Sequence, residues 1–99
     1  MQRNTEFVLV AYDITDDKRR TRVSDTLLAF GSTRVNYSVF ECLITKANLK
    51  KLKKQIEEII NKKEDNVRYY TLCQSCIQDI ENHGIPVSSP FDQEEVVII

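Results

Sequence analysis

The sequence predicts one α+β domain, a two-layer sandwich with the ferredoxin-like order β-α-β-β-α-β, and three observations support this fold class. The chain of 99 residues is long enough for one two-layer core. Two stretches carry apolar residues at the steps of three and four that mark one face of a helix. Short runs rich in β-branched and aromatic residues, which favour strands, lie before, between and after these helical stretches.

The first strand is expected at residues 7–12 (FVLVAY), an apolar run that is too short to cross a membrane. The run ends at Asp13, and a helix follows with Thr15 or Asp16 as its N-cap. Its apolar face carries residues four and three apart, Val23, Leu27 and Phe30. Gly31 supplies the C-terminal stop, because glycine readily adopts the left-handed conformation that ends helices.

Residues 33–44 (TRVNYSVFECLI) have the composition of a strand but are too many for one ordinary strand. The polar break at residues 36–38 therefore predicts two strands, at about 33–36 and 39–44, joined by a tight turn or a sharp bend.

Thr45 is the expected N-cap of a second helix that runs to about Lys62. The buried face of this helix carries residues three or four apart, Leu49, Leu52, Ile56 and Ile59. Residues 67–72 then supply the last strand of a core that spans about residues 6–72.

The last four residues, 96–99 (VVII), are apolar, and an apolar strand left unpaired is an aggregation hazard. Pairing with the sheet of a second subunit would protect this segment. We therefore expect a single domain over residues 1–99, in which residues 73–99 form a C-terminal dimerisation extension with an extra strand that pairs in a homodimer.

The net charge of −1 hides an asymmetry along the chain. Residues 1–63 carry thirteen lysines and arginines against eight acids, whereas residues 64–99 carry one against seven. A local basic surface can bind phosphates even when the overall charge is near zero. The candidate nucleic-acid contacts are cations of the two helices, Arg19, Arg20, Arg22, Lys50, Lys51 and Lys54. For the lysines, an ordinary solvated helix face is the alternative.

Asp13 stands where a buried strand emerges, and helix capping does not require an acid there. One aspartate cannot hold Mg²⁺ tightly, because this ion takes six oxygen ligands. If a two-fold axis brings two copies of Asp13 together, a metal between them can activate water for phosphodiester cleavage. The alternative is a strand-end residue that pairs with an arginine.

The three cysteines do not indicate a disulfide framework. Cys73 and Cys76 have zinc-ligand spacing, with His83 seven residues further on, but one such pair predicts zinc only weakly. Cys42 lies in an apolar strand, where cysteine behaves as a small hydrophobe. With two glycines the chain cannot form a glycine-rich phosphate loop, and it shows no secretory or membrane-spanning pattern, so we expect a cytoplasmic protein.

Several blocks in a fixed order closely resemble the small CRISPR-associated proteins of the adaptation machinery, the "Cas two" family. These blocks are residues 12–17 (YDITDD) with Arg20, then Gly31, residues 34–41 (RVNYSVFE) and residues 67–73 (VRYYTLC). The resemblance covers most of the chain.

This resemblance implies a ferredoxin-like homodimer that acts beside the CRISPR integrase in spacer acquisition and binds duplex DNA or single-stranded RNA. It also implies a metal-dependent endonuclease in some members, with Mg²⁺ or Mn²⁺ shared between Asp13 of two subunits. Two alternatives stay open: a structural adaptor without catalysis, and a toxin-like ribonuclease of related fold.

The functional positions of the family fall on one acid, two aromatic residues and three arginines: Asp13, Tyr12, Phe40, Arg20, Arg22 and Arg34. The resemblance implies that Asp13 is the metal ligand. It also implies that Arg20 and Arg34 bind the phosphate and that Tyr12 and Phe40 determine the shape of the site. The family commonly has glutamine where this chain has the shorter Asn36.

Overall fold

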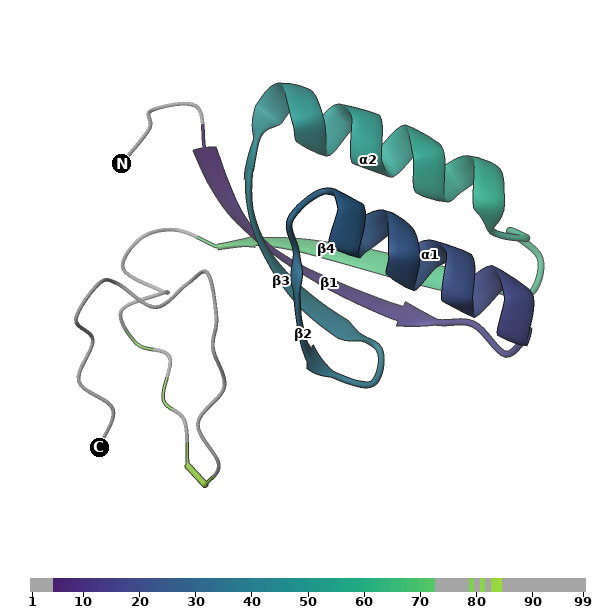
Figure 1. Cartoon of the computed structure of the whole chain (residues 1–99), viewed down its shortest axis with the longest axis horizontal. Helices are drawn as coiled ribbons and strands as arrows, with labels where there is room; N and C mark the ends of the chain where they lie inside the picture. Colours follow the sequence, from purple (N-terminus) through teal and green to yellow (C-terminus); the bar gives the residue numbers. More distant parts are fainter. Residues whose placement is uncertain (1–4, 73–78, 80, 82, 85–99) are drawn as a thin grey trace.

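The computed structural model describes residues 5–72, 79, 81, 83 and 84, and its elements follow the predicted β-α-β-β-α-β order (Figure 1). The elements are β1 (Thr5–Asp13), α1 (Asp17–Ala29), β2 (Thr33–Asn36), β3 (Val39–Thr45), α2 (Lys46–Ile59) and β4 (Asn66–Leu72). The predicted fold class is therefore confirmed.

The four strands form one antiparallel sheet in the order β2-β3-β1-β4. Both helices lie on the same face of this sheet, which makes the two layers of the sandwich (Figure 1). No helix of the described residues covers the opposite face, which we call the open face of the sheet.

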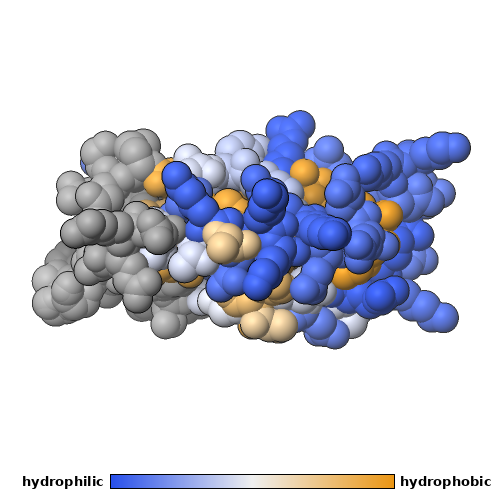
Figure 2. All heavy atoms as spheres, turned by 90° about the horizontal axis from the view of Figure 1, so that it is seen from above, coloured by the Kyte–Doolittle hydropathy of each residue, from blue (hydrophilic) through white to orange (hydrophobic). Residues whose placement is uncertain are grey.

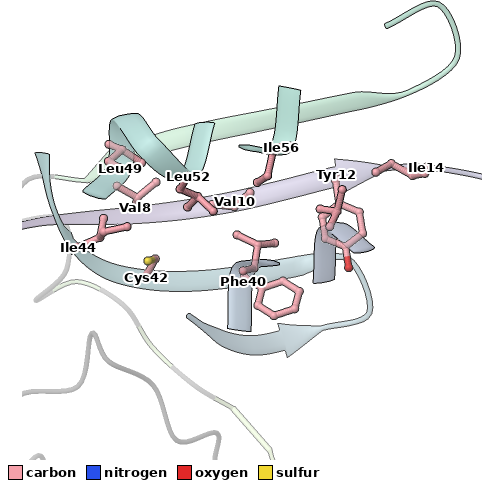
Figure 3. Packing of buried hydrophobic residues seen from close by; sticks show 12 residues of the cluster. Val8, Val10, Tyr12, Ile14, Phe40, Cys42, Ile44, Leu49, Leu52 and Ile56 are labelled. Carbon is pink, nitrogen blue, oxygen red and sulfur yellow. The ribbon is translucent and has the colours of Figure 1, made fainter. Parts of the chain in front are cut away.

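Alternation along β1 sorts its side chains between the two faces of the sheet. Val8, Val10 and Tyr12 are buried against the helices, where they join a core that includes Phe40 and Leu52 (Figure 3). The alternate residues of β1 face the other way, onto the open face: Phe7, Leu9, Ala11 and Asp13. Tyr12 and Asp13 are neighbours in sequence but therefore lie on opposite faces.

The ends of α1 are set by its caps. Asp16 is the N-cap, because its carboxylate accepts a hydrogen bond from the backbone N–H of Arg19 at 2.9 Å. At the other end Gly31 has a φ of 85°, a conformation that favours glycine, and this confirms the predicted stop.

The predicted division of residues 33–44 into two strands is also confirmed. β2 and β3 form a hairpin whose register shifts between Arg34 and Asn36, which indicates a β-bulge at this point. The Asn36 side chain accepts a hydrogen bond from the N–H of Tyr37 at 2.7 Å, so this residue helps to form the turn.

The predicted cap of α2 is confirmed, since the hydroxyl of Thr45 accepts a hydrogen bond from the N–H of Asn48 at 3.1 Å. The predicted end of α2 at Lys62 was wrong, because the helix stops at Ile59. The cause is a closed turn after the helix. The Asn61 carbonyl accepts from the N–H of Asp65 at 2.8 Å, and the Asp65 carboxylate accepts from the N–H of Asn61 at 2.9 Å.

The proposed C-terminal dimerisation extension, residues 73–99, lies outside the described residues apart from positions 79, 81, 83 and 84, so its strand stays a prediction. Cys73 and Cys76 also lie outside them. His83 is exposed beside Glu81, and Cys42 is buried, which raises the pKa of its thiol. Within the described residues no helix is long and apolar enough to span a membrane.

Candidate functional site

Asp13 is the last residue of β1 and is exposed. Its cross-strand neighbour is Asn66, the first residue of β4, and side chains opposite each other in such a pair lie on the same face. Among the described residues no three histidine, cysteine or acidic side chains come together as a metal cluster. One copy of the chain therefore offers a carboxylate and an amide oxygen here, which is too few to enclose Mg²⁺.

Tyr12, Phe40 and Arg34 form a cluster on the helix-covered side of the sheet. The rings of Tyr12 and Phe40 stack with their centroids 6.1 Å apart, and the Arg34 guanidinium lies 5.1 Å from the Phe40 centroid. Arg34 also donates to the Ser24 hydroxyl at 2.6 Å and to the Tyr37 carbonyl at 3.1 Å. The cluster therefore joins the β2–β3 turn to α1 and does not include Asp13.

The guanidinium of Arg20 forms hydrogen bonds with the backbone that connects β1 to α1. It donates to the carbonyl of Ile14 at 3.1 Å and to that of Thr15 at 3.2 Å, and it forms an ion pair with Asp17. Arg20 thus satisfies backbone acceptors directly after Asp13, in addition to any contact that it makes with a phosphate.

Arg19 takes part in a partly buried ion pair that the sequence pattern did not reveal. Its Nε lies 2.7 Å from Oδ2 of Asp65, and its Nη2 lies 3.2 Å from Oδ1 of Asp65 and 3.0 Å from Glu64. The Asp65 side chain is fully buried and the Arg19 side chain is 24% exposed. Arg19 therefore has an internal partner within the fold, and its role as a nucleic-acid contact stays a prediction.

The hydrogen bonds from Arg19 hold the pKa of the Asp65 carboxyl below its usual value. A lowered pKa in the folded state stabilises the fold above the pKa of the unfolded chain, and this stabilisation is lost as pH falls through the folded-state pKa. Asp65→Asn should therefore lower the melting temperature at neutral pH, and the difference from the wild type should shrink as pH falls below the ordinary aspartate pKa of about 3.9. Circular dichroism melts across this range would measure the difference.

Glu64→Gln is the control for this prediction, because the Glu64 side chain also contacts Arg19 but is 61% exposed. Exposed ion pairs contribute little to stability. If the two variants lost equal stability at neutral pH, burial of the Arg19–Asp65 pair would not be the cause.

Three of the predicted contacts, Lys50, Lys51 and Lys54, are exposed on the side of α2 that faces away from the sheet. None of the ion pairs among the described residues involves them. Figure 2 looks onto this helix layer and shows mostly hydrophilic side chains over it. We call these three residues the α2 lysine patch.

Two further cations of the helix layer have different surroundings. Lys53 lies 5.2 Å over the ring of Tyr69, whose pKa is raised to about 12, chiefly by burial. Arg22 lines an open groove of about 480 Å³ between α1 and α2, where Asp25 and Glu58 are also present. These acids reduce the positive potential around Arg22.

The structure does not bring all the predicted site residues together. Asp13 faces the open side of the sheet, the Tyr12–Phe40–Arg34 cluster faces the helices, and the α2 lysine patch lies on the outer surface of the helix layer. Arg68 of β4 is exposed on the same face as Asp13, because its cross-strand partner is Ala11. The alternation of side chains along β4 would have predicted this position of Arg68, but the motif residues alone did not single Arg68 out.

Comparison with known proteins matches this fold to one family. The family model described as "CRISPR associated protein Cas2" matches residues 6–80. A "CRISPR-associated endoribonuclease Cas2 3" of Synechocystis sp. is 38% identical over 78 residues, which are 79% of this chain and 84% of that protein. A "Cas2 4" of the same description from Rhodospirillum rubrum is 33% identical over 90 residues, 91% of this chain and 72% of the relative.

Solved structures agree with this assignment. Streptococcus pyogenes Cas2 superposes with a TM-score of 0.69 at 34% identity, over 79% of this chain and 99% of that chain. A chain of a "Partial Cas6-RT-Cas1--Cas2 complex" superposes with a TM-score of 0.66 at 31% identity, over 78% of this chain and 89% of that chain. The protein therefore belongs to the CRISPR-associated Cas2 family, as its sequence motifs predicted.

Proposed function

We propose that this protein is a homodimer that binds nucleic acid beside the CRISPR integrase during spacer acquisition. The observation that carries this proposal is the difference between the two outer surfaces of the sandwich. The helix layer presents the α2 lysine patch, whereas the open face of the sheet presents apolar side chains. The similar chain solved in a complex with Cas1 supports an integrase partner.

The open face has the composition of a protein interface. Phe7 packs against Leu72 on this face, and Leu43 and Tyr70 are 40% and 42% exposed on it. Contiguous apolar surface on a soluble protein marks an interaction site. A second copy of the chain is the proposed occupant, because self-association through one face of a two-layer fold gives a closed two-fold dimer.

Leu43→Lys should weaken this dimer and raise its dissociation constant about tenfold or more, because it places a charge in the apolar interface. Sedimentation equilibrium of the full chain over a concentration series would measure the change. Leu28→Lys is the matched control, since Leu28 is 51% exposed on α1 in the other layer. Equal dissociation constants for the two variants would exclude the open face as the dimer interface.

A second candidate function is a metal-dependent endonuclease that acts on RNA or duplex DNA. Asp13 supports it, because this exposed acid lies on the same sheet face as the apolar residues of the proposed interface. Dimerisation through that face would place two copies of Asp13 along one interface. The names of the curated relatives, which are called endoribonucleases, also support it.

The donor set fits Mg²⁺ or Mn²⁺ only in the dimer. Two Asp13 carboxylates give two hard oxygen ligands, and the Asn66 amides and water can complete the shell. The ion would supply Lewis acidity toward the phosphodiester and toward water. Asp13 would hold the ion, and Arg68, exposed on the same face, is placed to contact the phosphate.

A further inference from the structure

The Arg19–Asp65 ion pair joins the two segments that flank the end of β1. Arg19 lies in the first turn of α1, and residues 14–16 connect this helix to Asp13. Asp65 directly precedes Asn66, the residue that pairs with Asp13 across the sheet. The ion pair therefore links the start of α1 to the start of β4, and the Asp13↔Asn66 pair links the end of β1 to the same part of β4.

Both members of the pair are themselves fixed. The backbone N–H of Arg19 donates to the Asp16 carboxylate at 2.9 Å, so the residue is held at its main chain as well as at its guanidinium. The Asp65 carboxylate also accepts from the N–H of Asn61 at 2.9 Å. The Asp65 side chain is fully buried while these partners are in place, so removal of one partner leaves its carboxylate without a hydrogen bond that the fold supplies.

We propose that Arg19 and Asp65 are positioning residues for Asp13, which keep its strand end in register with Asn66. This inference rests on the proposed function of Asp13 as a metal ligand. Ligand side chains need supporting residues that fix their position to a fraction of an ångström. Loss of such a support lowers metal affinity by about 10- to 100-fold.

The test compares Asp65→Asn with a variant that loses stability elsewhere. Leu49→Ala is that control, since Leu49 and Ile14 lie at opposite ends of the core and Ile14 directly follows Asp13 (Figure 3). Arg19→Lys is a milder second variant, which keeps the charge but loses the two-point contact. All full-length variants are studied at a temperature where circular dichroism shows them to be folded.

Two measurements are made on each variant. Amide hydrogen exchange gives the exchange rates of the backbone N–H groups at the Asp13 end of the β1–β4 ladder, from the pair Ala11↔Arg68 to the pair Asp13↔Asn66. These rates are compared with those of the pair Phe7↔Leu72 at the other end of the ladder. Calorimetric titration with Mn²⁺ alone reports the affinity of the metal site. Asp65→Asn should speed exchange at the Asp13 end about tenfold or more and weaken Mn²⁺ binding about tenfold, with smaller effects in the same direction for Arg19→Lys.

Leu49→Ala should leave both the relative exchange at the Asp13 end and the Mn²⁺ affinity unchanged. Equal effects of Asp65→Asn and Leu49→Ala would overturn the proposal, since the ion pair would then only stabilise the whole fold. If the wild type bound no Mn²⁺, the metal-dependent function would fail. The exchange measurement would then decide by itself whether Arg19 and Asp65 hold the strand end.

Discussion

Asp13→Asn is expected to lower metal-dependent cleavage of RNA and duplex DNA about 100-fold or more. The substitution keeps the size of the side chain but removes the charge that holds the ion. A metal contributes several kcal/mol to the transition state, and about 1.4 kcal/mol corresponds to a factor of ten in rate. Cleavage would be measured with Mg²⁺, Mn²⁺ or EDTA on identically purified wild type and variant.

Asp25→Asn is the matched control, because Asp25 is an exposed acid of α1 on the other layer of the fold. If Asp13→Asn and the wild type cut equally fast, the activity does not come from the strand end. If neither protein cuts while dimerisation and nucleic-acid binding remain, the chain is an adaptor, and the endonuclease proposal fails.

The element order could be predicted because apolar periodicity is a local property of the sequence. The caps Asp16 and Thr45 and the stop at Gly31 are local as well, and the structure confirms them. The end of α2 was missed because it depends on a turn closed by Asp65. The sequence has no periodic signal for that hydrogen bond.

The arrangement of the candidate site was less predictable than the fold. The partner of Arg19 lies 46 residues away, so no spacing rule could find it. Arg20 and Arg34 have the charge expected of phosphate contacts, but each also donates to backbone carbonyls whose positions depend on the folded loops. The alternation of side chains between the two faces of a strand, by contrast, can be read from the sequence, and along β1 it places Tyr12 and Asp13 on opposite faces.

Replacing Lys50, Lys51 and Lys54 together with glutamine is expected to weaken nucleic-acid binding by about 100-fold at low salt. Each lysine that neutralises a phosphate releases counterions, so the loss of three should reduce the slope of log affinity against log salt by about 2–3. Fluorescence anisotropy of labelled duplex DNA and single-stranded RNA across a salt series would measure both quantities.

The matched control replaces Lys18, Lys62 and Lys63 with glutamine, which removes the same charge outside the α2 lysine patch. An equal loss of affinity in the control would mean that net charge, and not the patch, drives binding. The patch and Asp13 lie on opposite sides of the sandwich, and distant sites act independently. The patch variant should therefore keep the Mn²⁺ affinity of the wild type, so that binding on the helix layer and metal chemistry on the open face can be separated in one protein.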